Sequence, residues 1–373
     1  MASLLSSSLG TSPRGSSFVL LQSSTAQTCL PILRAIVQRS SGSARESLVL
    51  ICLLYPPSRL LASSTQVDSA RIHILDRTTD VPGYNDSDES DGEWKARLKQ
   101  SILDAVRAAP QGALTVAIDS CDTLLSDLAS LSETTRLLSD VLALVRERGA
   151  PSRLVLHLVA PSPLLAPLLA TRFSPALTHL TAHPAALLPH LAAAYLVHPP
   201  PAASPTSSAS PPSPADAKFW RVFSPFAARA PDVERLVFGP GGPGGAGAAD
   251  ELVVEALVRG GGGGGAGGRR GVERGLEGWA GGAPCALREL GGLKALFAGR
   301  KAAASEPGGT ADPTQDLSFN LNLTPEQQRS RAQVPLPYAH EGKPVVPAPG
   351  VILYDPDSAD DLDDDDPDED LDI

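Results

Sequence analysis

Three short stretches of the sequence contain residues whose types could support phosphate or metal chemistry. The first, LLQSSTAQTC (residues 20–29), lies between an apolar strand pattern and a helix pattern, where a phosphate-binding loop would sit. Such a loop needs glycines, whose backbone N–H groups turn toward the phosphates, and a lysine that neutralises their charge. Residues 20–29 contain neither, and their hydroxyl groups supply no positive charge. We therefore predict no catalytic residue and no nucleotide cofactor at this loop.

The second stretch, ALTVAIDSCD (residues 113–122), closes an apolar run with an aspartate. Asp119 has the place of an acid that holds Mg²⁺ in nucleotide-hydrolysing proteins. Without a lysine-bearing phosphate loop, this metal would have no phosphate to bridge. We therefore expect Asp119 to end a buried strand, and Asp122 or Ser120 to start the next turn.

The third stretch contains His179 and His183, whose spacing would align them on one face of a helix as metal ligands. The segment has a strand pattern, Pro184 follows at once, and no third ligand is near. We predict no metal site here.

Two glycine-rich stretches, residues 239–250 and 261–271, resemble nucleotide-binding fingerprints only superficially. Neither follows a strand and opens a helix within a βαβ unit, as a dinucleotide fingerprint requires. A long run of glycines is also entropically costly to order, so a flexible hairpin loop is expected. Arg269, Arg270 and Arg274 form a basic cluster beside the second stretch. They are either part of a solvated loop or contacts to the phosphate backbone of RNA.

Strand and helix patterns alternate along the first 200 residues, which predicts an α/β domain with a mostly parallel sheet flanked by helices. Strands are expected at residues 16–24, 47–55, 71–75, 113–118 and 153–160, with weaker ones at 176–182 and 193–198. Helices are expected at residues 26–40, 93–109 and 130–148. Beyond a Pro/Ser-rich stretch, strands are expected at residues 218–226, 233–239 and 251–260.

Composition limits the class of protein. Of 373 residues, 35 are Pro and 33 are Gly, concentrated in blocks, so the foldable part is smaller than the chain. The net charge of −11 is misleading, because residues 355–373 hold 12 acids and no bases, leaving 31 basic and 30 acidic residues elsewhere. Such a run of like charges repels itself and stays solvated.

The four cysteines lie far apart, which favours reduced thiols over a disulfide framework or a zinc site. No apolar run reaches the roughly 18 residues that a membrane span needs. The first 45 residues have four arginines, many serines and no acid, which is typical of a mitochondrial transit peptide. The same residues also fit a strand and a helix of the fold.

The predicted organisation has six parts. They are a first part of the core (1–198), a Pro/Ser-rich linker (199–216), the rest of the core with glycine-rich loops (217–297), a second linker (298–315), an extended docking segment (316–342) and an acidic disordered tail (343–373).

The docking segment shows a strand period, with Phe319, Leu321 and Leu323 alternating before Thr324 and Pro325. Attached to a linker, it is too short to fold alone, so we expect it to dock on a sheet edge, in this chain or in a partner. The predicted docking side chains are apolar or aromatic: Phe319, Leu321, Leu323, Val334, Leu336 and Tyr338.

Several segments together resemble the family of the fifth subunit of the Elongator complex. They are FNLNLTPEQQRSRAQVPLPY, the tail GVILYDPDSADDLDDDDPDEDLDI, FWRVFSPFAARAPDVERLVFG and GVERGLEGW. The resemblance implies a RecA-like fold that lacks the nucleotide-binding signature, with no catalytic residue in this chain. It also implies a heterohexameric ring with the fourth and sixth subunits, two copies of each. This ring binds tRNA and joins the catalytic subcomplex that modifies carbon five of wobble uridines, in cytoplasm and nucleus.

Two other functions are compatible with the residues. One is a degenerate P-loop-type ATPase, and the other is a protein that binds histones or RNA-associated partners through its acidic tail. The resemblance favours a non-catalytic scaffold subunit over both.

Overall fold

The computed structural model describes residues 4–10, 16–62, 70–80, 90–200, 214–244, 251–260 and 272–303. All of them belong to the first of two compact units, Met1–Glu306. The second unit, Pro307–Ile373, lies outside the described residues.

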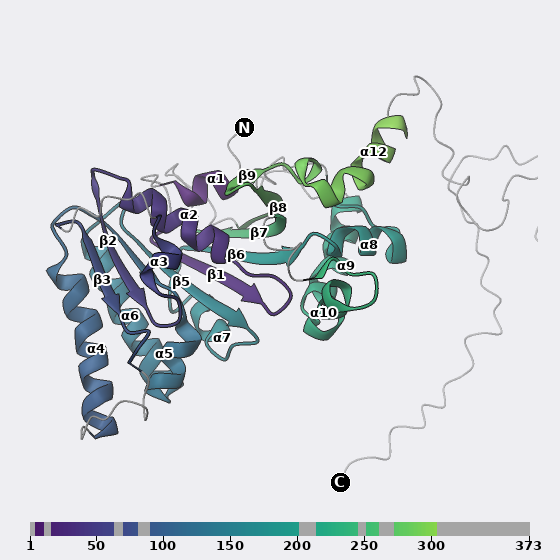
Figure 1. Cartoon of the computed structure of the whole chain (residues 1–373). Helices are drawn as coiled ribbons and strands as arrows, with labels where there is room; N and C mark the ends of the chain where they lie inside the picture. Colours follow the sequence, from purple (N-terminus) through teal and green to yellow (C-terminus); the bar gives the residue numbers. More distant parts are fainter. Residues whose placement is uncertain are drawn as a thin grey trace, which may run out of the picture. The chain divides into compact units, whose positions relative to one another are not determined.

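The described part of the chain is built on a nine-stranded sheet with the order β3-β2-β4-β5-β1-β6-β7-β8-β9 (Figure 1). Its strands are β1 (Phe18–Ser24), β2 (Glu46–Cys52), β3 (Ile72–Asp76), β4 (Ala113–Ile118), β5 (Arg153–Ala160), β6 (Leu177–Pro184), β7 (Glu251–Arg259), β8 (Val272–Ala280) and β9 (Ala283–Cys285).

Helices connect and cover these strands. They are α1 (Leu4–Leu9), α2 (Leu30–Ser41), α3 (Pro57–Leu60), α4 (Asp91–Ala108), α5 (Cys121–Leu128), α6 (Leu131–Glu147), α7 (Leu165–Leu169), α8 (Leu187–Tyr195), α9 (Pro214–Ala227), α10 (Ala230–Phe238), the 3₁₀ turns η1 (Leu287–Glu289) and η2 (Gly291–Leu293), and α12 (Lys294–Ala303).

The sheet is parallel from β3 to β6 and antiparallel from β6 to β9. The first strand lies at its centre, where Val19 pairs with Val155 of β5 on one side and with Thr178 of β6 on the other. All seven residues of β2 are buried, as expected for a parallel strand covered on both faces. This confirms the predicted architecture, a mostly parallel sheet flanked by helices.

Two apolar cores lie on the two faces of this sheet. Helices α4, α5 and α6 bury their apolar stripes on one face, where Ile102, Leu124 and Leu138 are fully buried. On the other face, α1 and α2 pack through Leu5 and Ile36 (Figure 1). At roughly 1.5–3 kcal/mol for each fully buried aliphatic side chain, these layers hold the parallel strands in place.

The first residues described are part of this packed structure. The carboxylate of Glu277 in β8 accepts hydrogen bonds from the backbone N–H groups of Leu4 (2.7 Å) and Leu5 (3.2 Å) at the start of α1. The buried guanidinium of Arg153 donates a hydrogen bond to the backbone oxygen of Leu9, the last residue of α1 (3.1 Å). These contacts include residues 4–9 in the fold.

Three predicted strands are wrong. Residues 193–195 of the strand expected at 193–198 continue α8, whose Leu191 is fully buried. The segment 218–226 lies in α9, and 233–238 lies in α10. In α9, Phe219, Phe223 and Phe226 recur at spacings of four and three and face the core together. Aromatic residues are common in strands, and for this reason the sequence suggested a strand here. The spacing of the buried aromatic side chains is that of a helix, as the structure shows.

Some predicted boundaries also differ from the observed elements. Helix α9 begins at Pro214, inside the linker predicted at 199–216, and α12 continues to Ala303, inside the linker predicted at 298–315. Strand β8 was not expected, but it pairs antiparallel with β7, so the glycine-rich stretch 261–271 joins the two strands of a hairpin as predicted. Within the described ranges, no helix has the length and apolar composition needed to cross a bilayer.

Candidate functional site

The carboxyl ends of the parallel strands form the edge of the sheet where open α/β proteins bind their ligands. The loop after β1 passes through this position, and its hydroxyl groups are bonded within the chain. Ser24 Oγ accepts a hydrogen bond from Gln27 N–H (3.2 Å), and Thr28 Oγ1 accepts one from Leu30 N–H (3.1 Å). Ser23 Oγ accepts one from Cys29 N–H (2.7 Å).

The start of α2 presents no row of free N–H groups to an anion. Pro31 has no N–H, and the N–H groups of Ile32 and Leu33 both donate to Cys29 O at 3.0 Å. Outside the helix, the Thr25 hydroxyl donates to the Glu234 carboxylate of α10. A carboxylate at the loop would repel a phosphate, which is the opposite of what a nucleotide site requires.

Asp119 directly follows the buried strand β4, in agreement with the prediction that it closes this strand, and it organises the neighbouring loop. Its side chain is fully buried and accepts hydrogen bonds from the backbone N–H groups of Leu53 (2.8 Å), Leu54 (3.0 Å) and Tyr55 (2.6 Å). Burial raises the pKa of the Asp119 carboxyl, and the three N–H groups offset part of this rise. The acid in the expected magnesium position therefore binds the backbone that follows β2.

The neighbouring residues behave as predicted for a turn. Ser120 is the N-cap of α5, and its Oγ accepts a hydrogen bond from Thr123 N–H (3.2 Å). Asp122 accepts a hydrogen bond from Val159 N–H (2.7 Å), which ties the first turn of α5 to the end of β5.

His157 connects three central strands. Its Nδ1 lies 2.6 Å from the backbone oxygen of Asp119, which can only accept, so Nδ1 carries the proton. Its Nε2 then accepts from the Ser23 hydroxyl at 2.7 Å. Burial lowers the pKa of the imidazole, which favours this neutral tautomer.

Ser23 and His157 have the types and the separation of a nucleophile and its base. Their exposed fractions are only 2% and 1%, so no substrate reaches them. The pair acts as a structural bridge from β1 to β5 and β4.

A second polar cluster joins β6, β7, β8 and α9. Glu255 accepts hydrogen bonds from His183 Nε2 (3.1 Å) and from Arg274 Nε (2.7 Å). Burial alone would raise the pKa of the Glu255 carboxyl, but the hydrogen bonds and charges of His183 and Arg274 outweigh it and lower that pKa to about 2. His179 donates from Nε2 to Gln22 Oε1 (2.9 Å), and burial lowers the pKa of its imidazole to about 4.

His179 and His183 therefore have separate protein partners, on a strand as the sequence predicted. Among the described residues, no group of three or more His, Cys, Asp and Glu side chains could hold a metal ion.

Arg274 is not part of a solvated loop. It lies in β8, where its guanidinium is 4.0 Å from the Trp220 ring centroid and donates from Nη2 to Ser224 Oγ (2.9 Å), both in α9. With its charge compensated by Glu255, it anchors α9 to the sheet. Arg269 and Arg270, the other two predicted RNA contacts, lie outside the described residues.

All six predicted docking side chains, Phe319, Leu321, Leu323, Val334, Leu336 and Tyr338, also lie outside the described residues. The sequence reasoning missed the two polar clusters, because their members are brought together by the fold over long separations. Only the helical spacing of the aromatic residues in α9 could have indicated where Trp220 and Ser224 lie.

The fold and this site define a class of protein: an α/β protein with a mostly parallel central sheet, in which the loop after β1 and the Asp119 carboxylate are hydrogen-bonded within the chain.

Comparison with known proteins adds a family for one segment. The family model for Elongator subunit Iki1 matches residues 291–355. Elongator complex protein 5 of Danio rerio is 43% identical over 68 residues, and that of Homo sapiens is 41% identical over 70. Each match covers 17% of this chain and 23% of the relative. The chain thus spans about a quarter of the length of the curated relatives it matches.

The predicted resemblance to the fifth Elongator subunit is confirmed over this segment. Among solved structures, a KaiC-like protein from Pyrococcus horikoshii OT3 aligns with 16% identity and a TM-score of 0.33, covering 45% of this chain and 73% of that chain. A likeness this weak adds nothing to the fold assignment, which rests on the strand order.

Proposed function

We propose that this chain is a non-catalytic scaffold subunit of an Elongator complex. The observation that carries the proposal is the family match over residues 291–355, which contains all six predicted docking side chains. The described part of the chain supports the proposal that the subunit is non-catalytic. At the place of a nucleotide site, the loop hydroxyls and Asp119 are engaged in hydrogen bonds within the protein.

In this proposal the chain joins the fourth and sixth Elongator subunits in a heterohexameric ring with two copies of each. The ring holds tRNA and binds the catalytic subcomplex that modifies wobble uridines, in cytoplasm and nucleus. The folded α/β unit then serves as a rigid body in the ring, and the segment 316–342 serves as its connection to a neighbour.

The test is co-expression of the full chain with the fourth and sixth subunits of the same organism. We expect affinity purification of this chain to recover both partners, and light scattering to give the mass of a hexamer. Deletion of residues 316–342 should abolish recovery, whereas deletion of residues 355–373 should leave it nearly unchanged. Purification of this chain without either partner would overturn the proposal.

The same preparations separate the two rival functions. Saturable binding of a fluorescent ATP analogue to the full chain would support a degenerate ATPase. Asp119→Ala is a poor test of ATPase function, because Asp119 is hydrogen-bonded to the backbone that follows β2 and its loss would disturb the fold. Glu234→Gln is better, because it removes the negative charge beside the loop without touching the core. Loss of activity on deleting residues 355–373 alone would support an acidic-tail binding protein.

A further inference from the structure

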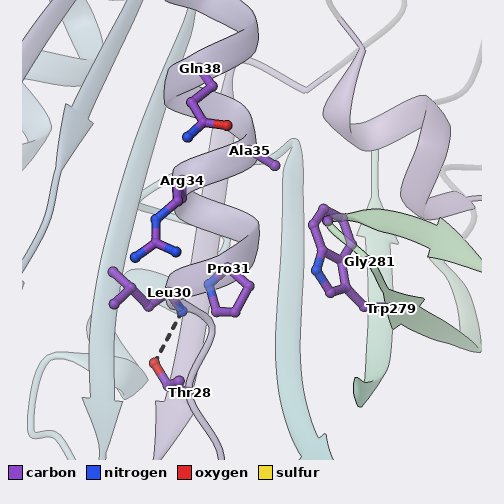
Figure 2. A pocket seen from close by; sticks show the side chains of 9 residues that line it. Thr28, Leu30, Pro31, Arg34, Ala35, Gln38, Trp279 and Gly281 are labelled. Carbon is purple, nitrogen blue, oxygen red and sulfur yellow. Dashed lines mark hydrogen bonds between the residues drawn. The ribbon is translucent and has the colours of Figure 1, made fainter. Parts of the chain in front are cut away.

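A hollow of about 510 Å³ lies between α2 and the β8–β9 turn, away from the polar clusters described above (Figure 2). One wall is α2, and the other is Trp279 with the turn residues Gly281 and Gly282. Figure 2 shows Pro31 and Ala35 on the side of α2 that faces Trp279. A half-open hollow of this size, with apolar walls and few polar groups, has the features of a binding site.

A two-glycine turn borders the hollow. Gly281 and Gly282 have φ values of +59° and +80°, which side-chain-bearing residues rarely adopt. A Cβ at either position would meet no atom of the described residues within 4 Å, apart from its chain neighbours.

One charged side chain lines the hollow. Among the residues that the structure describes, this is Arg34, and no carboxylate lines it. The Nε of Arg34 donates to the backbone oxygen of Arg59 (2.8 Å), which fixes the guanidinium. Within the described residues, its two terminal nitrogens make no hydrogen bond or ion pair. Gln38, one helical turn further along α2, adds an amide to the same wall.

Two further basic residues lie on the α2 side of the hollow. Helix α2 carries Arg34 and Arg39 and no acidic residue, and the neighbouring α3 carries Arg59. Both Arg39 and Arg59 are exposed. A planar guanidinium held in a fixed orientation suits a carboxylate, which it can bind through two parallel hydrogen bonds.

We propose that this hollow binds an extended segment of a partner protein in which acidic residues alternate with bulky apolar ones. The carboxylate pairs with Arg34, and the adjacent apolar side chain packs against Pro31 and Ala35, which are both partly exposed. A phosphate chain is a poorer fit, because a single guanidinium and no free N–H groups at the start of α2 face the hollow. The proposal does not depend on ring assembly.

The test uses the full chain and a fluorescein-labelled peptide of alternating aspartate and leucine. Two matched peptides carry lysine or asparagine in place of every aspartate. We expect the aspartate peptide to bind at least tenfold more tightly than either control by fluorescence anisotropy. Arg34→Glu should weaken binding at least tenfold. Arg136→Glu, at an exposed arginine of α6 on the other face of the sheet, should change it less than twofold.

A second variant covers the case in which Arg34→Glu disturbs the fold. Ala35→Trp fills the hollow from the partly exposed side of α2 without removing the Arg34 contact, and it should also weaken binding at least tenfold. Equal binding of the lysine peptide would overturn the proposal, as would unchanged binding by both variants. If polyuridylate displaces the peptide and its own binding requires Arg34, the hollow is instead a nucleic-acid-binding surface, which would also overturn the proposal.

Discussion

The structure predicts that Asp119 contributes to the stability of the fold, and substitution by asparagine tests this directly. In the native protein one carboxylate oxygen accepts from Leu53 N–H, and the other accepts from Leu54 and Tyr55 N–H. Asparagine keeps the shape but presents an NH₂ group at one of these two positions. At best it keeps two hydrogen bonds and leaves the Leu53 N–H facing another donor.

One buried, unpaired N–H group costs about 1–3 kcal/mol, and removal of the buried charge offsets part of this. We therefore expect Asp119→Asn to lower the free energy of unfolding by about 1–2 kcal/mol, and Asp119→Ala, which loses all three bonds, by about 3–5 kcal/mol. For a folded unit of this size, each kcal/mol lost from the free energy of unfolding lowers the melting temperature by about 2–4 °C.

The assay is urea denaturation of the full chain at pH 7, followed by circular dichroism and repeated as a thermal scan. Asp140→Asn, at an exposed position of α6, is the matched control and should stay within about 0.5 kcal/mol of wild type. If Asp119→Asn were as mild as this control, or if asparagine and alanine gave equal losses, the hydrogen-bond account would be refuted.

Three further predictions concern Asp127, His179 and Phe223. Burial raises the pKa of Asp127 to about 6, above its unfolded value, so its ionisation opposes folding as pH rises above about 4. Asp127→Asn should then stabilise the protein at pH 7 by about 1 kcal/mol, after allowing for a half-exposed site, and this gain in urea denaturation should vanish near pH 4. Burial lowers the pKa of His179 to about 4, so stability present above pH 6.5 should fall by up to about 3 kcal/mol as pH drops to 4. In His179→Gln the free energy of unfolding should depend less steeply on pH. An unchanged slope would show that His179 is not the source of this pH dependence. Phe223→Ala should cost about 3–5 kcal/mol in the same assay and Val222→Ala, at a partly exposed position, under about 1 kcal/mol; similar losses would contradict the helical phase of α9.

The parallel half of the sheet was predictable from the sequence because its signals are local. A strand such as β2 is a continuous apolar run, and α6 has an N-cap serine, Ser130, whose Oγ accepts from Glu133 N–H. The last part of the domain was harder to predict. In α9 the high content of Phe and Trp suggested a strand, whereas the spacing of Phe219 and Phe223 already indicated a helix.

The polar clusters could not be predicted from single residues. Ser23 and His157 are 134 positions apart, and only the pairing of β1 with β5 brings them together. The absence of glycine and lysine from the loop after β1 was visible in the sequence. The bonds that occupy that loop were not, because they depend on where β4, β5 and α10 lie in space.

The hydrogen bonds around this loop have a consequence for how stability responds to the cell. A protein whose fold is completed by a ligand gains free energy with ligand concentration, about 2.7 kcal/mol when the ligand is at one hundred times its dissociation constant. Here the hydroxyl of Ser23 is bonded to His157 and to the Cys29 N–H without any ligand. These bonds join groups of the protein itself, so their own contribution to folding does not depend on the concentration of a ligand. If the chain serves in a ring as proposed above, these bonds would stabilise that ring equally when the energy charge of the cell rises or falls.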